Sequence, residues 1–310
     1  MAEFTFFCSR CGKSIQCDTG YCGAEINCPA CQQPITVPKP LNPPTTPQAQ
    51  TMNASVGKSP RHTKRNTLVV VAIAVVFLLI AGLGLFLFSQ LHAKPPGMVA
   101  WWPAEGNAHD SISHNNGTLQ GGVSFARGKF GQAFRFDGPD AAVKITAKPD
   151  LNVGAGDGFT IECWINPSDL SQLHPIAEWN TGRGSWGVHF YIDVGGTGNL
   201  YANIVDSSGL WHNFQTRGNI VRINTFQHVA LTYDKVSGEA KMYCNGKIVL
   251  EETIGVFKPQ TTFDLYLGRR PGTGGESYAF AGLMDEVGIY RRALSPSEIA
   301  AIYNAGKTRE

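Results

Sequence analysis

The pattern of apolar and polar residues divides the chain into segments of different character. Residues 67–88, TLVVVAIAVVFLLIAGLGLFLF, contain no charged side chain. A helix of about 22 residues is roughly 33 Å long, enough to cross a hydrocarbon layer of about 30 Å. The run therefore predicts one transmembrane helix. A buried core helix would usually keep a polar face, and a signal peptide would lie closer to the amino terminus.

Beyond residue 97 the pattern changes to short alternating runs, which are typical of strands that cover a core with one face. Apolar residues alternate with polar or mixed ones in 159–166, and 229–233 repeats this period. The Asn-Gly pair at 245–246 predicts a tight hairpin. One helix is expected after Ser295, which can form a capping box with Glu298. The pattern predicts an all-β sandwich with a short C-terminal helix.

Charges beside the apolar run predict its orientation. Lys58, Arg61, Lys64 and Arg65 precede it, and only Lys94 lies close on the other side. Because cytoplasmic loops carry an excess of Lys and Arg, we expect a single-pass cell-membrane protein with a cytoplasmic N-terminus and an exported C-terminal part. The net charge of +2 gives no sign of the basic patch that nucleic-acid binding requires.

Four of the eight cysteines form two C-x-x-C pairs, Cys8 with Cys11 and Cys28 with Cys31. Each pair can bind one face of a tetrahedral ion, and this spacing is typical of a four-cysteine zinc site. A reducing cytoplasm also favours metal-binding thiolates over disulfides. Residues 4–38 resemble the zinc-ribbon modules of bacterial membrane proteins. We expect Zn²⁺ to supply most of the folding free energy of this ribbon.

The ribbon is expected to bind an unknown cytoplasmic protein. Cys17 and Cys22 lie outside the tetrad and are either free thiols or part of an alternative site. Residues 39–66, rich in polar and basic residues and in proline, predict a disordered basic linker.

Several blocks of the C-terminal part resemble the laminin-G-like, concanavalin A-like domains of bacteria. They include MVAWWPAEGNAHDSI, FARGKFGQAFRFDG, FTIECWINP, QHVALTYD and FAGLMDEVGIYRRALSPSEIAAIYNAG, and together they cover residues 97–306. The resemblance implies two stacked antiparallel sheets in a jelly-roll arrangement. It also implies a role in binding glycans or proteins at the cell surface.

This kind of sandwich hosts glycan hydrolases as well as lectins. The hydrolases carry their catalytic carboxylates on one strand as E-x-D-x-x-E, a motif that this sequence lacks. Glu162 and Glu178 stand alone, and the adjacent Asp285 and Glu286 are expected to point to opposite faces of a strand. We therefore expect a non-catalytic domain. An enzyme whose catalytic site has no recognisable motif is a less favoured alternative.

Tryptophans are the candidate ligand contacts, because an indole can stack on a sugar ring. Trp179, Trp186 and Trp211 lie beside turns rich in Gly and Ser, although packing at the sandwich rim is the alternative for each. The other three lie within strand patterns and are expected to be structural: Trp101, Trp102 and Trp164.

The resemblance also raises the question of Ca²⁺, the usual ion of related sandwiches. Asp285 alternates with Leu283, Val287 and Ile289, so its carboxylate is expected on an apolar face, where a charge needs a cation or hydrogen bonds. Together with Asp110 it could hold Ca²⁺, with amide or Arg partners as the alternative. The segment 269–271, Arg-Arg-Pro, differs from the acidic calcium-binding segment of pentraxins, so that type of site is not expected.

Cys163 and Cys244 both lie on apolar faces. The family strand order places 226–233 between their strands, which exceeds the reach of a disulfide, so two buried thiols are expected.

The leading interpretation is a membrane-anchored recognition protein whose exported lectin-like domain binds a glycan or another cell-surface ligand. The alternative is a structural or adhesion protein that binds protein or an envelope polymer.

Overall fold

The computed structural model describes residues 3–38, 95–193, 196–272 and 278–307. They belong to two compact units, each treated by itself. The expected linker at 39–66 and the expected transmembrane helix at 67–88 lie outside the described residues. Within the described ranges, no helix is both long and apolar enough to span a membrane.

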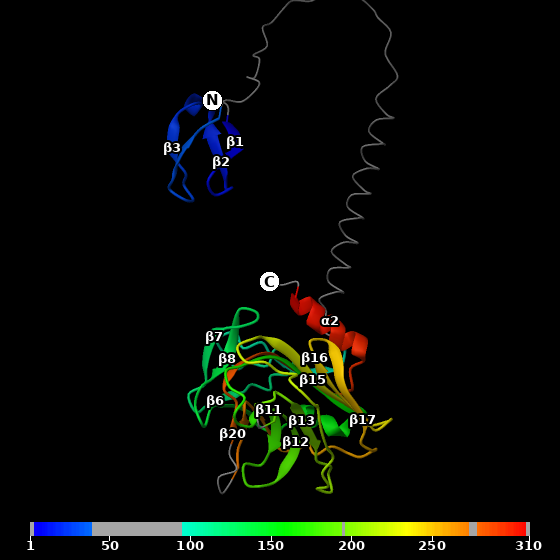
Figure 1. Cartoon of the computed structure of the whole chain (residues 1–310). Helices are drawn as coiled ribbons and strands as arrows, with labels where there is room; N and C mark the ends of the chain where they lie inside the picture. The colour runs from blue at the N-terminus through cyan, green and yellow to red at the C-terminus, as the bar shows by residue number, and fades with distance from the viewer. Residues whose placement is uncertain (1–2, 39–94, 194–195, 273–277, 308–310) are drawn as a thin grey trace, which may run out of the picture. The chain divides into compact units, whose positions relative to one another are not determined.

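The N-terminal unit consists of two β-hairpins (Figure 1). Strand β1 (Glu3–Phe7) pairs with β2 (Ser14–Asp18), the 3-10 turn η1 (Thr19–Tyr21) follows, and β3 (Glu25–Asn27) pairs with β4 (Pro34–Thr36). The buried core of this unit contains two of the cysteines together with Ile15 and Ile35. So small a core contributes little to the stability of this unit. An ion bound at the cysteines would supply much of its folding free energy.

The C-terminal unit is a sandwich of two antiparallel sheets with one helix, as the alternation predicted, and the arrangement fits a jelly roll. The eight-stranded sheet has the order β17 (Lys247–Thr253), β16 (Glu239–Cys244), β15 (Gln227–Asp234), β10 (Gly158–Pro167), β21 (Gly282–Tyr290), β8 (Gln132–Phe136) and β7 (Ser124–Arg127), and β5 (Met98–Trp102) also pairs with β21. The seven-stranded sheet has the order β14 (Asn213–Gln215), β13 (Leu200–Ile204), β12 (Trp186–Ile192), β11 (His174–Asn180), β18 (Asp264–Leu267), β9 (Ala142–Ile145) and β6 (Thr118–Gln120).

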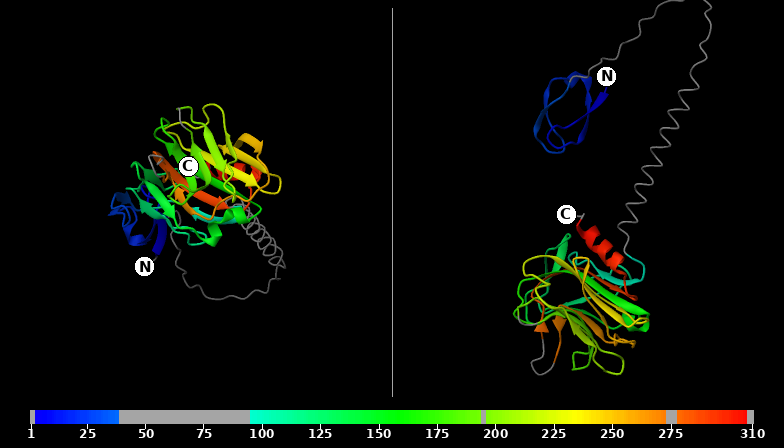
Figure 2. Two further views of the ribbon diagram at one scale, coloured as in Figure 1. Left: turned by 90° about the horizontal axis from the view of Figure 1, so that it is seen from below. Right: turned by 45° about the vertical axis from the view of Figure 1, so that its right-hand side comes forward.

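Five further elements complete the described part of the sandwich. Two 3-10 turns, η2 (Pro149–Leu151) and η3 (Val153–Ala155), precede β10. A two-residue strand β19 (Arg269–Arg270) pairs with β20 (Tyr278–Ala279). The helix α2 (Pro296–Lys307) lies against the outer face of the eight-stranded sheet (Figures 1 and 2).

The main core lies between the two sheets and contains the residues that the alternation assigns to it. In β10, Phe159, Ile161, Cys163 and Ile165 all belong to this core. The opposite face of β10 is buried as well, because α2 covers it. The ring of Tyr303 on α2 stacks on Trp164 with a centroid distance of 5.6 Å. The eight-stranded sheet therefore has buried residues on both faces near β10.

The local signals of the sequence are confirmed. Asn245 and Gly246 both adopt positive φ, as a two-residue hairpin between β16 and β17 requires. At the start of α2, the Glu298 N–H donates to Ser295 Oγ at 3.3 Å, and the Ser295 N–H donates to Glu298 Oε2 at 2.9 Å. These two bonds form the predicted capping box.

The state of the two sandwich cysteines also agrees with prediction. Val229 of β15 lies directly between Cys163 of β10 and Cys244 of β16, in register with both. Two strand spacings separate their backbones by about 9.5 Å, beyond the roughly 7 Å limit for a disulfide. Both thiols are free and buried, and burial raises the pKa of each.

Candidate functional site

The four predicted zinc ligands converge in the N-terminal unit. Cys8 Sγ lies 3.9 Å from Cys31 Sγ, and Cys11 Sγ lies 3.8 Å from Cys28 Sγ. All four sulfur atoms lie within 4.8 Å of one another. Sulfurs bound tetrahedrally at about 2.3 Å from one ion would be about 3.8 Å apart. The four thiols could therefore hold one metal ion without rearrangement.

The two hairpins build this cluster with the same local geometry. The residues that follow the two C-x-x-C pairs, Gly12 and Gln32, both have positive φ, and their N–H groups donate to the carbonyls of Cys8 and Cys28. Backbone N–H groups, foremost that of Cys31, lower the pKa of the Cys28 thiol to about 7. Such donors favour the thiolate form that binds metal.

The predicted calcium ligand Asp110 has no oxygen to offer a cation. Its carboxylate accepts four backbone hydrogen bonds of 2.8 to 3.1 Å, two on each oxygen. The donors are Trp101, Ile112, Ser113 and Asn115. Both oxygens are thus saturated, and the expectation of Asp110 as a calcium ligand is corrected. Backbone amides are the partners of this carboxylate.

A β-bulge places Asp285 on the other face of its strand from the one expected. Asp285 lies opposite Trp164 and Gly288 lies opposite Glu162, so two residues of β21 face the single Cys163. The first of them, Glu286, has a φ of 53°. This extra residue moves Asp285 from the face of Val287 and Ile289 to the outer face of the sheet.

The bulge also brings the two adjacent carboxylates to one side. Glu286 Oε2 accepts a hydrogen bond from the indole of Trp101, which lies opposite the outward Gly288. The expectation that Asp285 and Glu286 point to opposite faces is therefore wrong. Asp285 Oδ2 accepts the Phe130 N–H at 3.0 Å, and burial raises the pKa of Asp285 to about 7.

The three candidate tryptophans have different surroundings. Trp179 is fully buried in the main core, so it has no ring face for a ligand, and its assignment as a ligand contact is corrected. Trp186 is half-buried, and Trp211 is 49% exposed. Two of the three structural tryptophans, Trp102 and Trp164, are buried as expected.

Trp186 and Trp211 lie together, with their ring centroids 5.5 Å apart in an edge-to-face arrangement. The guanidinium of Arg270 lies 5.2 Å from the centroid of Trp186. A register shift between β11 and β12 pairs Trp186 with Asn180. The next residue, Gly187, faces the core, where an added Cβ would lie 2.9 Å from the Cβ of Trp179. The bulge thus aims Trp186 away from the core.

Next to this pair, a row of polar side chains crosses the outer face of the seven-stranded sheet. The row follows the strand register from β9 to β13: Lys144, Tyr266, Glu178, His189 and Asn203. Glu178 Oε2 and His189 Nδ1 are 2.6 Å apart, and both side chains are buried. The row was not predicted, because each residue is only one polar position of its own strand.

A strap formed by residues 268–272 crosses the row at β11. Strand β18 runs beside β11 from the pair Asn180–Asp264 to Ala177–Leu267, yet the carbonyl of Pro271 accepts a hydrogen bond of 3.1 Å from Asn180 Nδ2. The chain therefore turns back over β11 after Leu267 and carries Arg270 to Trp186. Glu178 Oε1 and His189 Nε2 have no hydrogen-bond partner in the part of the chain that the structure describes.

Glu162 and Glu178 are not a catalytic pair of one strand. They lie in different sheets, and each contacts a histidine on the neighbouring strand. The Glu162 carboxylate is 3.1 Å from His228 Nε2, on the face that α2 covers.

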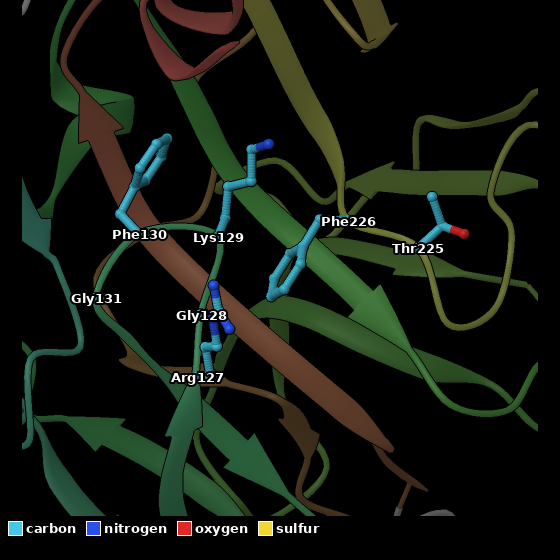
Figure 3. Close-up of a pocket in the computed structure, with 7 residues that line it drawn as sticks. All are labelled: Arg127, Gly128, Lys129, Phe130, Gly131, Thr225 and Phe226. Atoms are coloured by element: carbon cyan, nitrogen blue, oxygen red, sulfur yellow. The ribbon is translucent and has the colours of Figure 1, made fainter. Parts of the chain in front are cut away.

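A pocket of about 700 Å³ lies at the turn between β7 and β8. Its walls are residues 127–131 and the pair Thr225 and Phe226, which precede β15. Figure 3 shows the side chain of Lys129 between the rings of Phe130 and Phe226. No pattern in the sequence pointed to this pocket.

Comparison with known proteins agrees with the architecture. The model of the concanavalin A-like lectin/glucanases superfamily matches residues 137–300, which is just over half of the chain. A search of curated protein sequences found no match.

Several solved structures have the same fold. The binding domain of Paraclostridial Mosquitocidal Protein 1 is 18% identical with a TM-score of 0.54, and the match covers 67% of this chain and 52% of that one. Domain 4 of AbnA, a GH43 extracellular arabinanase from Geobacillus stearothermophilus, in complex with arabinotriose, is 18% identical with a TM-score of 0.50, and the match covers 66% of this chain and 98% of that one.

The botulinum neurotoxin serotype G binding domain is 17% identical with a TM-score of 0.51, and the match covers 66% of this chain and 50% of that one. The chain thus spans about half the length of the toxin binding domains that it matches, and at these identities the likeness concerns the fold. With the family match over residues 137–300 and the two-sheet sandwich, the chain belongs to the concanavalin A-like lectin/glucanases superfamily.

Proposed function

We propose that this chain is a membrane-anchored, non-catalytic recognition protein whose sandwich binds a glycan outside the cell. The pair formed by Trp186 and Trp211 carries the proposal. Trp211 offers an exposed indole face. The indole of Trp186 is a second aromatic group beside it, and the guanidinium of Arg270 lies over Trp186. Sugar rings bind to such surfaces through their C–H faces, with polar groups at the edge.

The fold neighbours support a binding role. Two of them are named as binding domains of toxins, and a third is a domain solved in complex with arabinotriose. The two isolated glutamates support a non-catalytic role, because Glu162 and Glu178 lie in different sheets and each is held by a buried histidine.

For the N-terminal unit, we propose Zn²⁺ as the ion held by the four cysteines. The sulfur spacings of 3.8 and 3.9 Å match a tetrahedral site. The bound ion would join the two hairpins into a rigid module that contacts a cytoplasmic protein. The charges around residues 67–88 support a membrane anchor between this module and an exported sandwich.

Binding of the purified full-length chain to a glycan array tests the main proposal. Trp211→Ala and Trp186→Ala should each weaken binding to the glycans that the unmodified chain binds on the array about five- to tenfold, because a lost aromatic contact is worth on the order of 1 kcal/mol. Leu119→Ala is the matched control, since Leu119 is 39% exposed on β6, at the opposite edge of the same sheet.

A blank array would contradict glycan binding. Retained pull-down of a surface protein would then favour the adhesion alternative, for which the 62% exposed Leu210 beside Trp211 provides an apolar contact. Turnover of a glycan polymer would contradict both non-catalytic readings.

Protease treatment tests the topology. Residues 97–310 should be digested in intact cells whose envelope admits the protease, and protected in inverted vesicles. The reverse result would contradict the proposed orientation.

A further inference from the structure

The pocket at the turn between β7 and β8 is a second site, apart from the tryptophan pair. Its walls belong to the eight-stranded sheet and the loop before β15, whereas Trp186 belongs to the seven-stranded sheet. A volume of about 700 Å³ lies within the usual range for small-ligand sites.

The lining side chains carry positive charge and no negative charge. Among the seven lining residues, Arg127 and Lys129 are cations, and the others are glycine, threonine and phenylalanine. Lys129 Nζ lies 5.0 Å from the ring centroid of Trp164, which is itself held by Tyr303. This contact keeps the ammonium group in place beside the pocket and lowers the entropy lost when a ligand binds.

Among the described residues, two carboxylates lie close to the turn, and each accepts a backbone hydrogen bond. Glu105 Oε2 accepts the Gln132 N–H at 3.2 Å. Asp285 lies beneath the turn, where its Oδ2 accepts the Phe130 N–H and would be 2.6 Å from a Cβ on Gly128. Because burial raises the pKa of Asp285 to about 7, a large fraction of this group is neutral near neutral pH, so Asp285 offsets the two cations of the pocket only in part.

The aromatic walls complete the recognition chemistry. Figure 3 shows the rings of Phe130 and Phe226 on either side of Lys129, with Arg127 at one end of the pocket. Phe130 is fixed by its backbone bond to Asp285 and by an edge-to-face contact with Trp164 at 6.1 Å. The pocket thus combines apolar ring surfaces with two cations.

We propose that this pocket binds an acidic sugar residue, whose ring lies against Phe226 and Phe130 while its anionic group pairs with Lys129 and Arg127. Charge-assisted hydrogen bonds to a carboxylate or sulfate supply the specificity, and the aromatic walls supply the apolar contact. Binding at this pocket does not depend on glycan binding at the tryptophan pair.

Isothermal titration of the full-length chain with trigalacturonate, a sulfated galactotriose and neutral galactotriose tests the proposal. We expect at least one acidic probe to bind about tenfold or more tightly than the neutral probe, and added NaCl to weaken that binding. The two acidic probes separate carboxylate from sulfate as the source of the anion.

Variants assign the binding to the pocket. Lys129→Gln and Arg127→Gln should each weaken binding of the acidic probe about tenfold, the usual effect of losing a charge-assisted hydrogen bond. Lys258→Gln removes an exposed cation elsewhere and should leave the affinity unchanged. Arg127 is exposed at the end of β7, so its replacement keeps the test valid even if Lys129→Gln disturbs folding.

Equal binding of acidic and neutral probes, or unchanged affinity in both pocket variants, would overturn the proposal. Trp211→Ala should have no effect on the acidic probe. A loss in that variant would place the acidic ligand at the tryptophan pair, and would overturn the pocket assignment while leaving the proposed function in place.

Discussion

Glu178 and His189 face each other across strands β11 and β12, and their side chains meet at 2.6 Å beneath the strap that carries Arg270. Both are buried, and each keeps one polar atom without a hydrogen-bond partner among the described residues. The loss of either member should destabilise the folded sandwich. Glu178 alone would be a buried charge without a partner, and His189 alone would be a buried polar group without one.

His189→Leu should therefore lower the free energy of unfolding of the sandwich by about 3 to 5 kcal/mol. The double variant with Glu178→Leu should recover much of this loss, since it removes the stranded carboxylate. Urea unfolding followed by tryptophan fluorescence measures both, because all six tryptophans lie between residues 101 and 211. Equal stability of the single and double variants would contradict the coupling.

Truncation of the buried Trp179 and of the exposed Trp211 should change the stability of the sandwich by very different amounts. Trp179→Ala opens a cavity in the main core and should cost about 3 to 5 kcal/mol of stability. Trp211→Ala removes a half-exposed ring and should change stability by less than about 0.5 kcal/mol. Thermal unfolding of both variants checks this. Comparable losses would mean that Trp211 has a structural role rather than a binding one.

The Asp285 carboxyl should make the stability of the sandwich depend on pH. Its pKa is about 7 in the folded chain and about 4 in an unfolded one, so the folded state holds a proton that the unfolded state has lost. Its contribution to stability is therefore complete below about pH 4 and is lost as the pH rises to about 7.

Asp285→Asn keeps an acceptor for the Phe130 N–H but cannot ionise. The variant should gain stability relative to the wild type as the pH rises from about 5 to about 8. The gain has an upper limit on the order of 4 kcal/mol, which is the free energy that corresponds to a pKa difference of about 3 between the folded and unfolded chain. Unfolding in urea at several pH values measures the difference. A constant difference across this range would contradict a raised pKa.

Removal of metal should unfold the N-terminal unit and leave the sandwich intact. A strong chelator or Cys28→Ser should abolish the amide protection of residues 3–38 in hydrogen exchange, because the apolar core there is small. Cys17→Ser is the control, since Cys17 lies outside the tetrad. Protection that survives chelation would show that the hairpins fold without an ion.

The sequence predicted those features that depend on neighbouring residues. The Asn245-Gly246 hairpin, the Ser295 capping box and the two cysteine knuckles are each encoded within a few positions, and all three are present. The position of Val229 between the two sandwich cysteines was also predictable, because it requires only the order of the family's strands.

The features that were missed depend on contacts between distant segments. Asp285 changes face because of a single extra residue at Glu286, and a regular period of two has no place for such a bulge. The surroundings of Asp110 and Trp179 are set by tertiary packing, so a local pattern of turns could not separate a buried side chain from an exposed one.

The row from Lys144 to Asn203 becomes visible only when the strands are aligned. Each strand has one outward polar residue at this level, and the register then brings five of them side by side. The alternation in β11 to β13 predicts which polar residues point outward. It does not predict which of them become neighbours, because that depends on the register between the strands.

The strap over β11 has a consequence for how this domain can diversify. Trp179 alternates along β11 with Glu178 and Asn180, and all three side chains are buried, so changes there affect the stability of the sandwich. Arg270 lies on the strap outside the ladder of β18, and it touches Trp186 without entering the main core. Substitutions at this position can therefore alter the charge beside the two tryptophans while the packing between the sheets stays intact, so the ligand preference of the proposed site could change without a change in the core.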